Sequence, residues 1–183
     1  GNPKSSVVLL NLNPAYGIES APESSLALYE KIARANFEHT FFEYPFYPLD
    51  PRLADVSAAG HGWWSKRCLG DLIYESGLSV KEFSKKIFCA EYFPYHSSQY
   101  GWNGGVLPSQ QYMIMLVEAA VSRGALIIVI WGKKNRNTWL KAIPSLSSAS
   151  VITLHSNQNP KISRGNLDEG VFEKIVGRLQ TQQ

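Results

Sequence analysis

The feature that most constrains this chain is the run Ala125–Trp131, in which every residue is apolar. A short apolar run rich in β-branched residues, with Gly132 after it, is typical of a strand covered on both faces. A second run, Val7–Leu10, ends in the polar turn sequence Asn11-Leu12-Asn13-Pro14. Fully buried strands of this kind occur in parallel sheets that carry helices on both sides.

Helical patterns alternate with the strands along the rest of the chain. Two further strands are predicted at residues 87–93 and 150–154. Apolar spacing predicts helices over about 22–37, 62–77 and 109–123, a short one beginning at Ser79, one opening after Gly132 and a last one opening at Asp168. This alternation predicts an α/β fold, a three-layer α/β/α sandwich around a central four-stranded, mostly parallel sheet. The length suits a single domain over residues 1–183.

Composition excludes several classes of function. The net charge of +3, without a long Lys/Arg block, permits contact with nucleic acid but does not demand it. Two cysteines, Cys68 and Cys89, cannot supply the four ligands of an iron–sulfur cluster or a structural zinc site. We therefore expect free thiols and no metal or organic cofactor. Without a signal peptide or an apolar membrane span, we expect a cytoplasmic, monomeric protein.

Polar residues follow several predicted strands. In an open α/β sheet ligands bind beyond the carboxyl ends of the strands, so Asn11, Asn13 and Tyr16 are candidate site residues after the first strand. His96 follows the second strand and His155 the last one. Simpler interpretations stay open, since Asn-Pro also starts turns and a single His is often a structural hydrogen-bonding group.

Two other segments allow a functional and a structural interpretation. The aromatic stretch 37–47 is either a loop packed on the core or a platform for a planar ring, with candidates Phe42, Tyr44 and Phe46. The helix start after Gly132 carries Lys133, Lys134 and Arg136. Helix amides with these basic side chains suit a phosphate, but a solvated helix start has the same composition.

Two separated motifs resemble the uracil-DNA glycosylase superfamily. Asn11-Leu12-Asn13-Pro14 resembles its water-activating loop, with Asn13 at the position that is Asp or Asn in different branches. His155 and the segment 156–165 resemble its His-containing loop with a trailing Arg-Gly, and Ile127–Gly132 resembles its apolar strand that ends in Trp-Gly. The motifs occur in the family's order over nearly the whole chain.

The chain also departs from the family pattern. Ser156 stands where the family has Pro after the His, and the following loop is one residue longer. Ala15 stands where the uracil-strict branch has a Tyr that excludes thymine, so the resemblance does not imply strict uracil selectivity. The family's uracil-recognising Asn after the second strand has no clear equivalent here.

The resemblance implies hydrolysis of the N-glycosidic bond of uracil or another altered base in DNA, single-stranded or mismatched. It implies that Asn13 holds the attacking water and that His155 donates a hydrogen bond to the leaving base. An aromatic from the 41–47 segment would stack on the base. The family pattern further implies phosphate contacts by basic residues, here Lys133, Lys134, Arg136, Lys161 and Arg164.

Two alternatives to an active glycosylase stay open. One is a protein of the same fold that has lost or changed the activity and binds a nucleobase, nucleotide or nucleic acid. The other is an unrelated α/β protein for a small molecule, because a fold does not fix a function.

Overall fold

The structure, a computed structural model, describes residues 1–14, 23–40, 43–95, 106–147 and 151–181. A four-stranded sheet lies at its centre, with strand order β2-β1-β3-β4. The strands are β1 (Val7–Asn11), β2 (Ile87–Glu91), β3 (Leu126–Val129) and β4 (Val151–Thr153). Every pairing is parallel, which confirms the predicted α/β class and parallel sheet.

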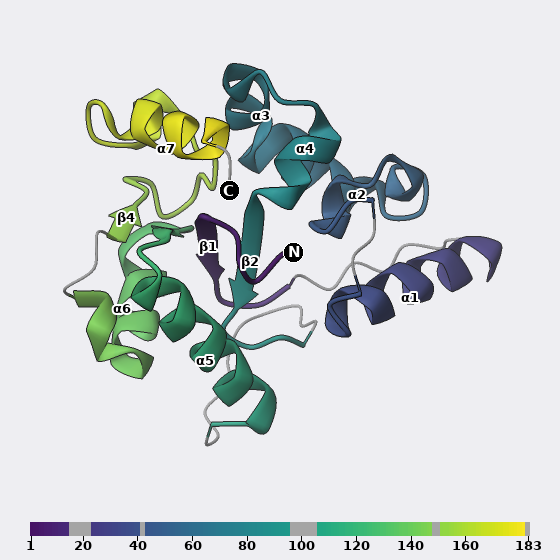
Figure 1. Cartoon of the computed structure of the whole chain (residues 1–183), viewed down its shortest axis with the longest axis horizontal. Helices are drawn as coiled ribbons and strands as arrows, with labels where there is room; N and C mark the ends of the chain where they lie inside the picture. The colour runs from purple at the N-terminus through teal and green to yellow at the C-terminus, as the bar shows by residue number, and fades with distance from the viewer. Residues whose placement is uncertain (15–22, 41–42, 96–105, 148–150, 182–183) are drawn as a thin grey trace.

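Helices cover both faces of this sheet (Figure 1). The described α-helices are α1 (Glu23–Phe37), α2 (Ala58–Gly62), α3 (Gly70–Ser76), α4 (Val80–Lys85), α5 (Pro108–Ser122), α6 (Gly132–Ala142) and α7 (Val171–Gln180). Short 3-10 turns span Tyr47–Leu49, Pro51–Leu53, Pro144–Ser147 and Arg164–Asn166. Helices α3, α4 and α7 pack on one face, α5 and α6 on the other, and α1 and α2 lie to the side of β2 (Figure 1).

The apolar runs of the sequence form the centre of both cores. Val7 and Leu9 of β1 pack toward α3 and α7, whereas Val8 and Leu10 pack toward α5 and α6. All four side chains are fully buried. A strand between two helical layers needs apolar side chains at every position, because successive residues point to opposite faces. No helix in the described part of the chain is long and apolar enough to cross a membrane.

The predicted helix over 62–77 is wrong as a single element. The chain instead runs through α2, a π-helical turn over Trp63–Cys68 and then α3. Leu69 N donates a 3.0 Å hydrogen bond to Trp64 O, five residues back, which makes the turn wider than an α-helical one. Both Trp63 and Trp64 pack against the core beneath α3 and α7. Apolar periodicity alone does not distinguish this interrupted helix from a regular one.

Helix starts follow the predicted chemistry in one case and not in two others. Ser79 and Glu82 form the predicted capping box of α4. Ser109 does not cap α5, which begins at Pro108 with Leu107 N bound by Gln110 Oε1 at 2.9 Å. The last helix begins after Gly170 rather than at Asp168. Pro108, at the first position of α5, has a backbone φ that already suits a helix. Gly170, just before α7, takes a left-handed conformation that glycine adopts without strain.

Candidate functional site at the carboxyl edge of the sheet

The carboxyl ends of the four parallel strands lie at one edge of the sheet, called here the carboxyl edge. Asn11 pairs in register with Glu91 on β2, and Ile130 N donates a 3.0 Å hydrogen bond to Leu10 O from the β3 side. Strand β3 lies between β1 and β4. The points where the chain leaves β1 and β4 are therefore two strand spacings, or about 10 Å, apart. Asn13 and His155, the predicted catalytic residues, thus follow strands on either side of β3.

Asn11 and Glu91 form a buried polar pair at this edge. Asn11 Nδ2 donates to Glu91 Oε1 at 3.1 Å, and the Cys89 thiol lies 3.8 Å from the same oxygen. Glu91 Oε2 is buried and has no hydrogen-bond partner within the described part of the chain. Since Leu9 and Cys89 belong to the core beneath α3 and α7, Asn11 and Glu91 point to that same side.

The Glu91 carboxyl titrates far from its ordinary range. Removal from water raises the pKa of Glu91 from 4.5 to about 7, although the hydrogen bonds from Asn11 and Cys89 favour the ionised form and lower it. Burial outweighs these two hydrogen bonds. At neutral pH both protonation states of the carboxyl are therefore populated, which is typical of functional sites and of some structural networks.

The backbone at the end of β1 is fixed from the opposite face. Asn11 O accepts hydrogen bonds from Trp139 Nε1 at 2.9 Å and from Tyr92 N at 3.1 Å. The rings of Tyr92 and Trp139 meet edge to face, with centroids 5.4 Å apart. These contacts hold the Asn11 side chain in position against Glu91.

Asn13 lies partly buried in the turn after β1. Its Nδ2 donates a 3.2 Å hydrogen bond to the carbonyl of Pro14. This bond agrees with the turn interpretation of the Asn-Pro sequence. The role of Asn13 in holding a water stays a prediction.

His155 lies at the carboxyl edge after β4 and is about half exposed. Its Nε2 is 2.9 Å from Asp168 Oδ1, and its backbone N–H donates to Asn166 O at 3.1 Å. An ionised carboxylate only accepts hydrogen bonds, so Nε2 carries the proton of this contact. Asp168 therefore orients the imidazole, and Nδ1 is the ring nitrogen left for a ligand.

Trp131 occupies the space after β3, between the ends of β1 and β4. Its φ of 65° is left-handed, an unfavourable conformation for a bulky residue, and Gly132 follows at 68°. The Trp131 ring packs on Trp63 with centroids 6.0 Å apart and planes 30° from parallel, and Trp63 meets Trp64 edge to face. The partly buried rings of Trp63 and Trp131 give the carboxyl edge an aromatic wall on the Asn11–Glu91 side of the sheet.

Asn157 connects the loop after His155 to the start of α6. Its Oδ1 accepts a 3.1 Å hydrogen bond from Lys133 N and lies where a Cβ on residue 132 would stand. Only glycine combines this contact with the positive φ at Gly132. The turn and the loop are therefore held together by one side chain.

The basic residues predicted for phosphate binding at α6 are only partly described. Lys133 is exposed and Arg136 is partly exposed, while the side chain of Lys134 lies outside the described residues. Asn135, in the first turn of α6, is 3% exposed, and its Nδ2 has no hydrogen-bond partner among the residues that the structure describes. It lies one turn before Trp139 and so faces the sheet near the end of β1.

Lys161 and Arg164 have carboxylate partners on the outer helices. Lys161 pairs with Asp71 at 2.9 Å. Arg164 bonds Glu75 through both terminal nitrogens at 3.2 Å and Glu173 through Nε at 2.7 Å. These pairs tie the loop after β4 to α3 and α7, so a phosphate would have to compete with carboxylates for these cations.

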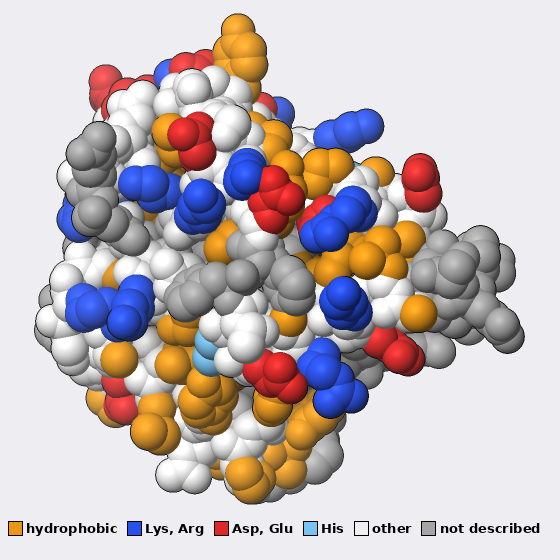
Figure 2. Space-filling view, turned by 45° about the vertical axis from the view of Figure 1, so that its right-hand side comes forward, with side chains coloured by type: hydrophobic (Ala, Val, Ile, Leu, Met, Phe, Trp, Pro, Cys, Tyr) orange, Lys and Arg blue, Asp and Glu red, His pale blue; other side chains and the backbone are white. Residues whose placement is uncertain are grey.

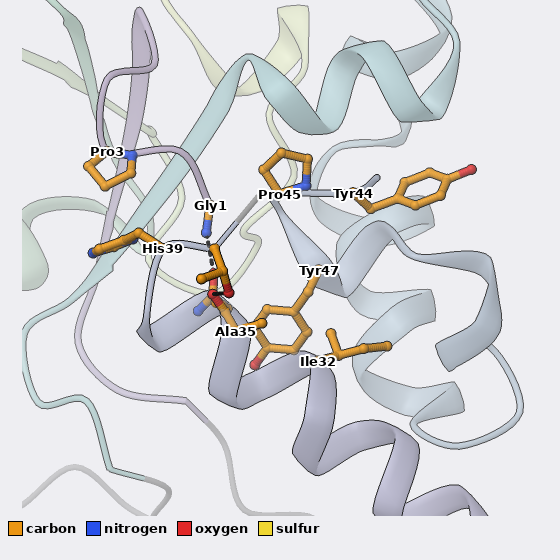
Figure 3. A pocket seen from close by; sticks show the side chains of 10 residues that line it. Gly1, Pro3, Ile32, Ala35, His39, Tyr44, Pro45 and Tyr47 are labelled. Carbon is orange, nitrogen blue, oxygen red and sulfur yellow. Dashed lines mark hydrogen bonds between the residues drawn. The ribbon is translucent and has the colours of Figure 1, made fainter. Parts of the chain in front are cut away.

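Tyr44 and Phe46 lie away from the carboxyl edge. Phe46 is 3% exposed, its N–H donates to Ser84 O just before β2, and its ring packs on Trp64. Tyr44 borders a shallow hollow open to solvent, and its ring extends away from Gly1 and His39 (Figure 3). The burial of Phe46 agrees with the core interpretation of this aromatic stretch, and the stacking roles of Tyr44 and Phe46 stay predictions.

The remaining predicted substrate contacts cannot be placed at the site. Tyr16, Phe42 and His96 lie outside the described residues. Glu91, Asn135 and the Trp63–Trp131 pair were not predicted as site residues. Glu91 had a sequence signal, since it is the one carboxylate in the otherwise largely apolar run 87–93.

The described residues contain no group of three or more His, Cys, Asp or Glu side chains able to hold a metal ion. On the face in Figure 2, Lys and Arg side chains form separate groups with Asp and Glu among them. Comparisons with protein-family models, with curated proteins and with solved structures gave no match to this chain.

Proposed function

We propose that the protein is a DNA glycosylase-like hydrolase that removes uracil or another altered base from DNA. The observation that carries the proposal is the grouping at the carboxyl edge, where Asn13 and His155 follow strands on either side of β3. The proposed fold family is that of the uracil-DNA glycosylases, and the proposed partner is single-stranded or mismatched DNA. Two free thiols agree with the proposed cytoplasmic location.

The proposed reaction is hydrolysis at the anomeric carbon of a flipped nucleotide. The C1′–N bond breaks, the base leaves with the electron pair, and the water oxygen forms the new bond to C1′. The proton that this water loses passes through solvent to the departing base, which is released in its neutral form. Asn13 would hold this water through its amide, but an amide cannot take the water's proton. A slow enzyme is therefore expected.

His155 would stabilise the negative charge that develops on the leaving base. One positioned donor of this kind contributes roughly 2.7–4 kcal/mol to a transition state. Because Nε2 donates to Asp168, donation from Nδ1 requires the doubly protonated imidazolium. The proposed mechanism therefore uses His155 in its charged form, with Asp168 holding the ring. Lys133, Lys134 and Arg136 are proposed to contact backbone phosphates.

A second candidate function is binding of a nucleobase or nucleotide without hydrolysis. The specific observation in its favour is that Asn13 Nδ2 bonds to the carbonyl of Pro14. A site whose Asn13 amide stays in this contact would bind a ring against the aromatic wall and leave the glycosidic bond intact.

The test is cleavage of labelled oligonucleotides that carry uracil, thymine opposite guanine, hypoxanthine or xanthine, in single and double strands. Abasic products are detected by alkaline strand scission. We expect cleavage of at least one substrate, lost in Asn13→Ala and kept in Asn137→Ala, a matched change at an exposed position of α6. Equal cleavage by wild type and Asn13→Ala would contradict the catalytic assignment. Binding of oligonucleotide without cleavage would favour the second function.

A further inference from the structure

The loop after β4, residues 155–166, is organised around the side chain of Asn166 and is called here the His155 loop. Asn166 is 5% exposed. Its Oδ1 accepts a 2.9 Å hydrogen bond from Ser156 N, and its Nδ2 donates to Asn159 O at 2.9 Å and to Lys161 O at 2.8 Å. An asparagine amide has two N–H donors and an acceptor oxygen, and each of these groups has a partner here. One buried side chain therefore joins the beginning of the loop to its middle.

The segment that contains Asn166 holds His155 at two points. The backbone N–H of His155 donates to Asn166 O at 3.1 Å, and Nε2 of its ring lies 2.9 Å from Asp168 Oδ1. Leu167, between these two partners, has an extended backbone and is buried in the core beneath α3 and α7. Residues on either side of an extended residue point away from its side chain. This alternation agrees with the contacts of Asn166 and Asp168, which both reach the His155 loop.

The middle of the His155 loop is fixed against the π-helical turn. Ile162 N donates a 3.0 Å hydrogen bond to Cys68 O, and the Cys68 thiol donates to Pro160 O at 3.4 Å. The side chains of Ile162 and Cys68 are fully buried. The two carbonyls that Asn166 binds belong to residues 159 and 161, on either side of Pro160. Asn166 thus connects this anchored part of the loop to the backbone beside His155.

We propose that Asn166 is the positioning residue of His155. The inference rests on the proposed function, in which the His155 ring donates a hydrogen bond to the leaving base. Asn166 fixes the backbone at residues 155 and 156, so that the ring meets Asp168 and Nδ1 is left for the ligand. A donor stabilises a transition state to the extent that it is held in place beforehand. A misplacement of about 1 Å by a change outside the reacting groups costs about a hundredfold in rate.

The substitution that removes this contact is Asn166→Ala. The matched control is Asn159→Ala, the same change in the same loop. It removes the exposed 3.1 Å hydrogen bond from Lys161 N to Asn159 Oδ1 and keeps the backbone carbonyl that Asn166 binds. Circular dichroism checks the folding of both variants. If Asn166→Ala does not fold, Asn166→Ser takes its place, because a hydroxyl retains a partner for one of the three groups.

The first experiment needs no activity. NMR on the whole chain measures exchange of the Ser156 amide and the nuclear Overhauser contact between the His155 ring and the Asp168 side chain. We expect slow exchange and the ring contact in wild type and Asn159→Ala. In Asn166→Ala we expect roughly tenfold faster exchange and loss of the ring contact. Fast exchange in wild type, or an unchanged ring contact in Asn166→Ala, overturns the inference.

The second experiment measures single-turnover base release at saturating enzyme. We expect Asn166→Ala to lower the rate roughly a hundredfold with unchanged affinity for the oligonucleotide, and Asn159→Ala to keep the rate. Adding Asn166→Ala to His155→Ala should lower the rate no further, because residues that act as a unit are not additive. A further large drop in the double variant overturns the inference. Absence of base release by wild type contradicts the proposed function instead, and the NMR experiment then decides the positioning of His155 by itself.

Discussion

The Glu91→Gln substitution makes a quantitative prediction for stability. The pKa of Glu91 is about 7 in the folded protein against 4.5 for the exposed group. Between these two pH values the folded protein keeps a proton that the unfolded chain has released. The stability that the neutral carboxyl provides is therefore fully present below about pH 4.5 and is lost as pH rises through about 7.

The size of this effect follows from the shift. A difference of 2.5 pKa units at about 1.36 kcal/mol each gives about 3 kcal/mol between pH 4 and pH 8. In Glu91→Gln, residue 91 does not titrate. The free energy of unfolding of this variant, relative to that of wild type, should therefore rise by about 3 kcal/mol from pH 4 to pH 8. For a chain of this length the difference corresponds to roughly 6–12 °C in Tm.

The assay is urea unfolding followed by circular dichroism at pH 4, 5, 6, 7 and 8 for wild type, Glu91→Gln and Glu118→Gln. The titrating groups other than Glu91 are common to wild type and Glu91→Gln and cancel in their difference. We expect this difference to grow with pH, and Glu118→Gln, which replaces an exposed carboxylate of α5, is the matched control for removal of one carboxylate. Parallel pH profiles for wild type and Glu91→Gln would refute the account of a desolvated carboxyl.

Three further predictions concern the elements around the site. Gly132→Ala should destabilise the protein by more than about 1–2 kcal/mol, because the new Cβ stands at a positive φ and overlaps Asn157 Oδ1. In thermal unfolding, adding Asn157→Ala should recover part of this loss of stability. If the double variant is less stable than Gly132→Ala alone, the overlap is not the cause. Trp139→Phe should cost about 1–3 kcal/mol in urea unfolding, because the Asn11 carbonyl loses one of its two donors and the smaller ring leaves space in the core, and an unchanged midpoint would contradict this role. Burial raises the pKa of Cys68, so a thiol reagent at pH 8 should label this cysteine only as the chain unfolds; labelling of Cys68 in the native protein within seconds would disprove its burial.

The strands and their parallel arrangement could be predicted from local sequence. Val7–Leu10 and Ala125–Trp131 are apolar at every position, and only strands between two helical layers require this. The predicted strands 87–93 and 125–131 are each two residues too long at the carboxyl end, because β2 ends at Glu91 and β3 at Val129. A strand ends where its neighbour stops pairing, and the partner is distant in sequence.

The set of residues that meet at the site is fixed by contacts between segments far apart in the sequence, and local sequence patterns carry no information about such contacts. Asn11 and Glu91 are 80 residues apart, and their pairing follows from the register of β1 with β2. The Trp63–Trp131 contact similarly joins a π-helical turn to the end of β3. The sequence identified His155 as an edge residue, but its Asp168 partner required the loop and the start of the last helix to be placed together.

The measurement that tests the central claim most directly is release of free base from oligonucleotides, detected by mass spectrometry under single-turnover conditions. The account predicts that one altered base and a matching abasic strand appear in equal amounts with wild type, and that Asn13→Ala releases neither. Intact oligonucleotides with every altered base after prolonged incubation, or equal release by wild type and Asn13→Ala, would contradict it.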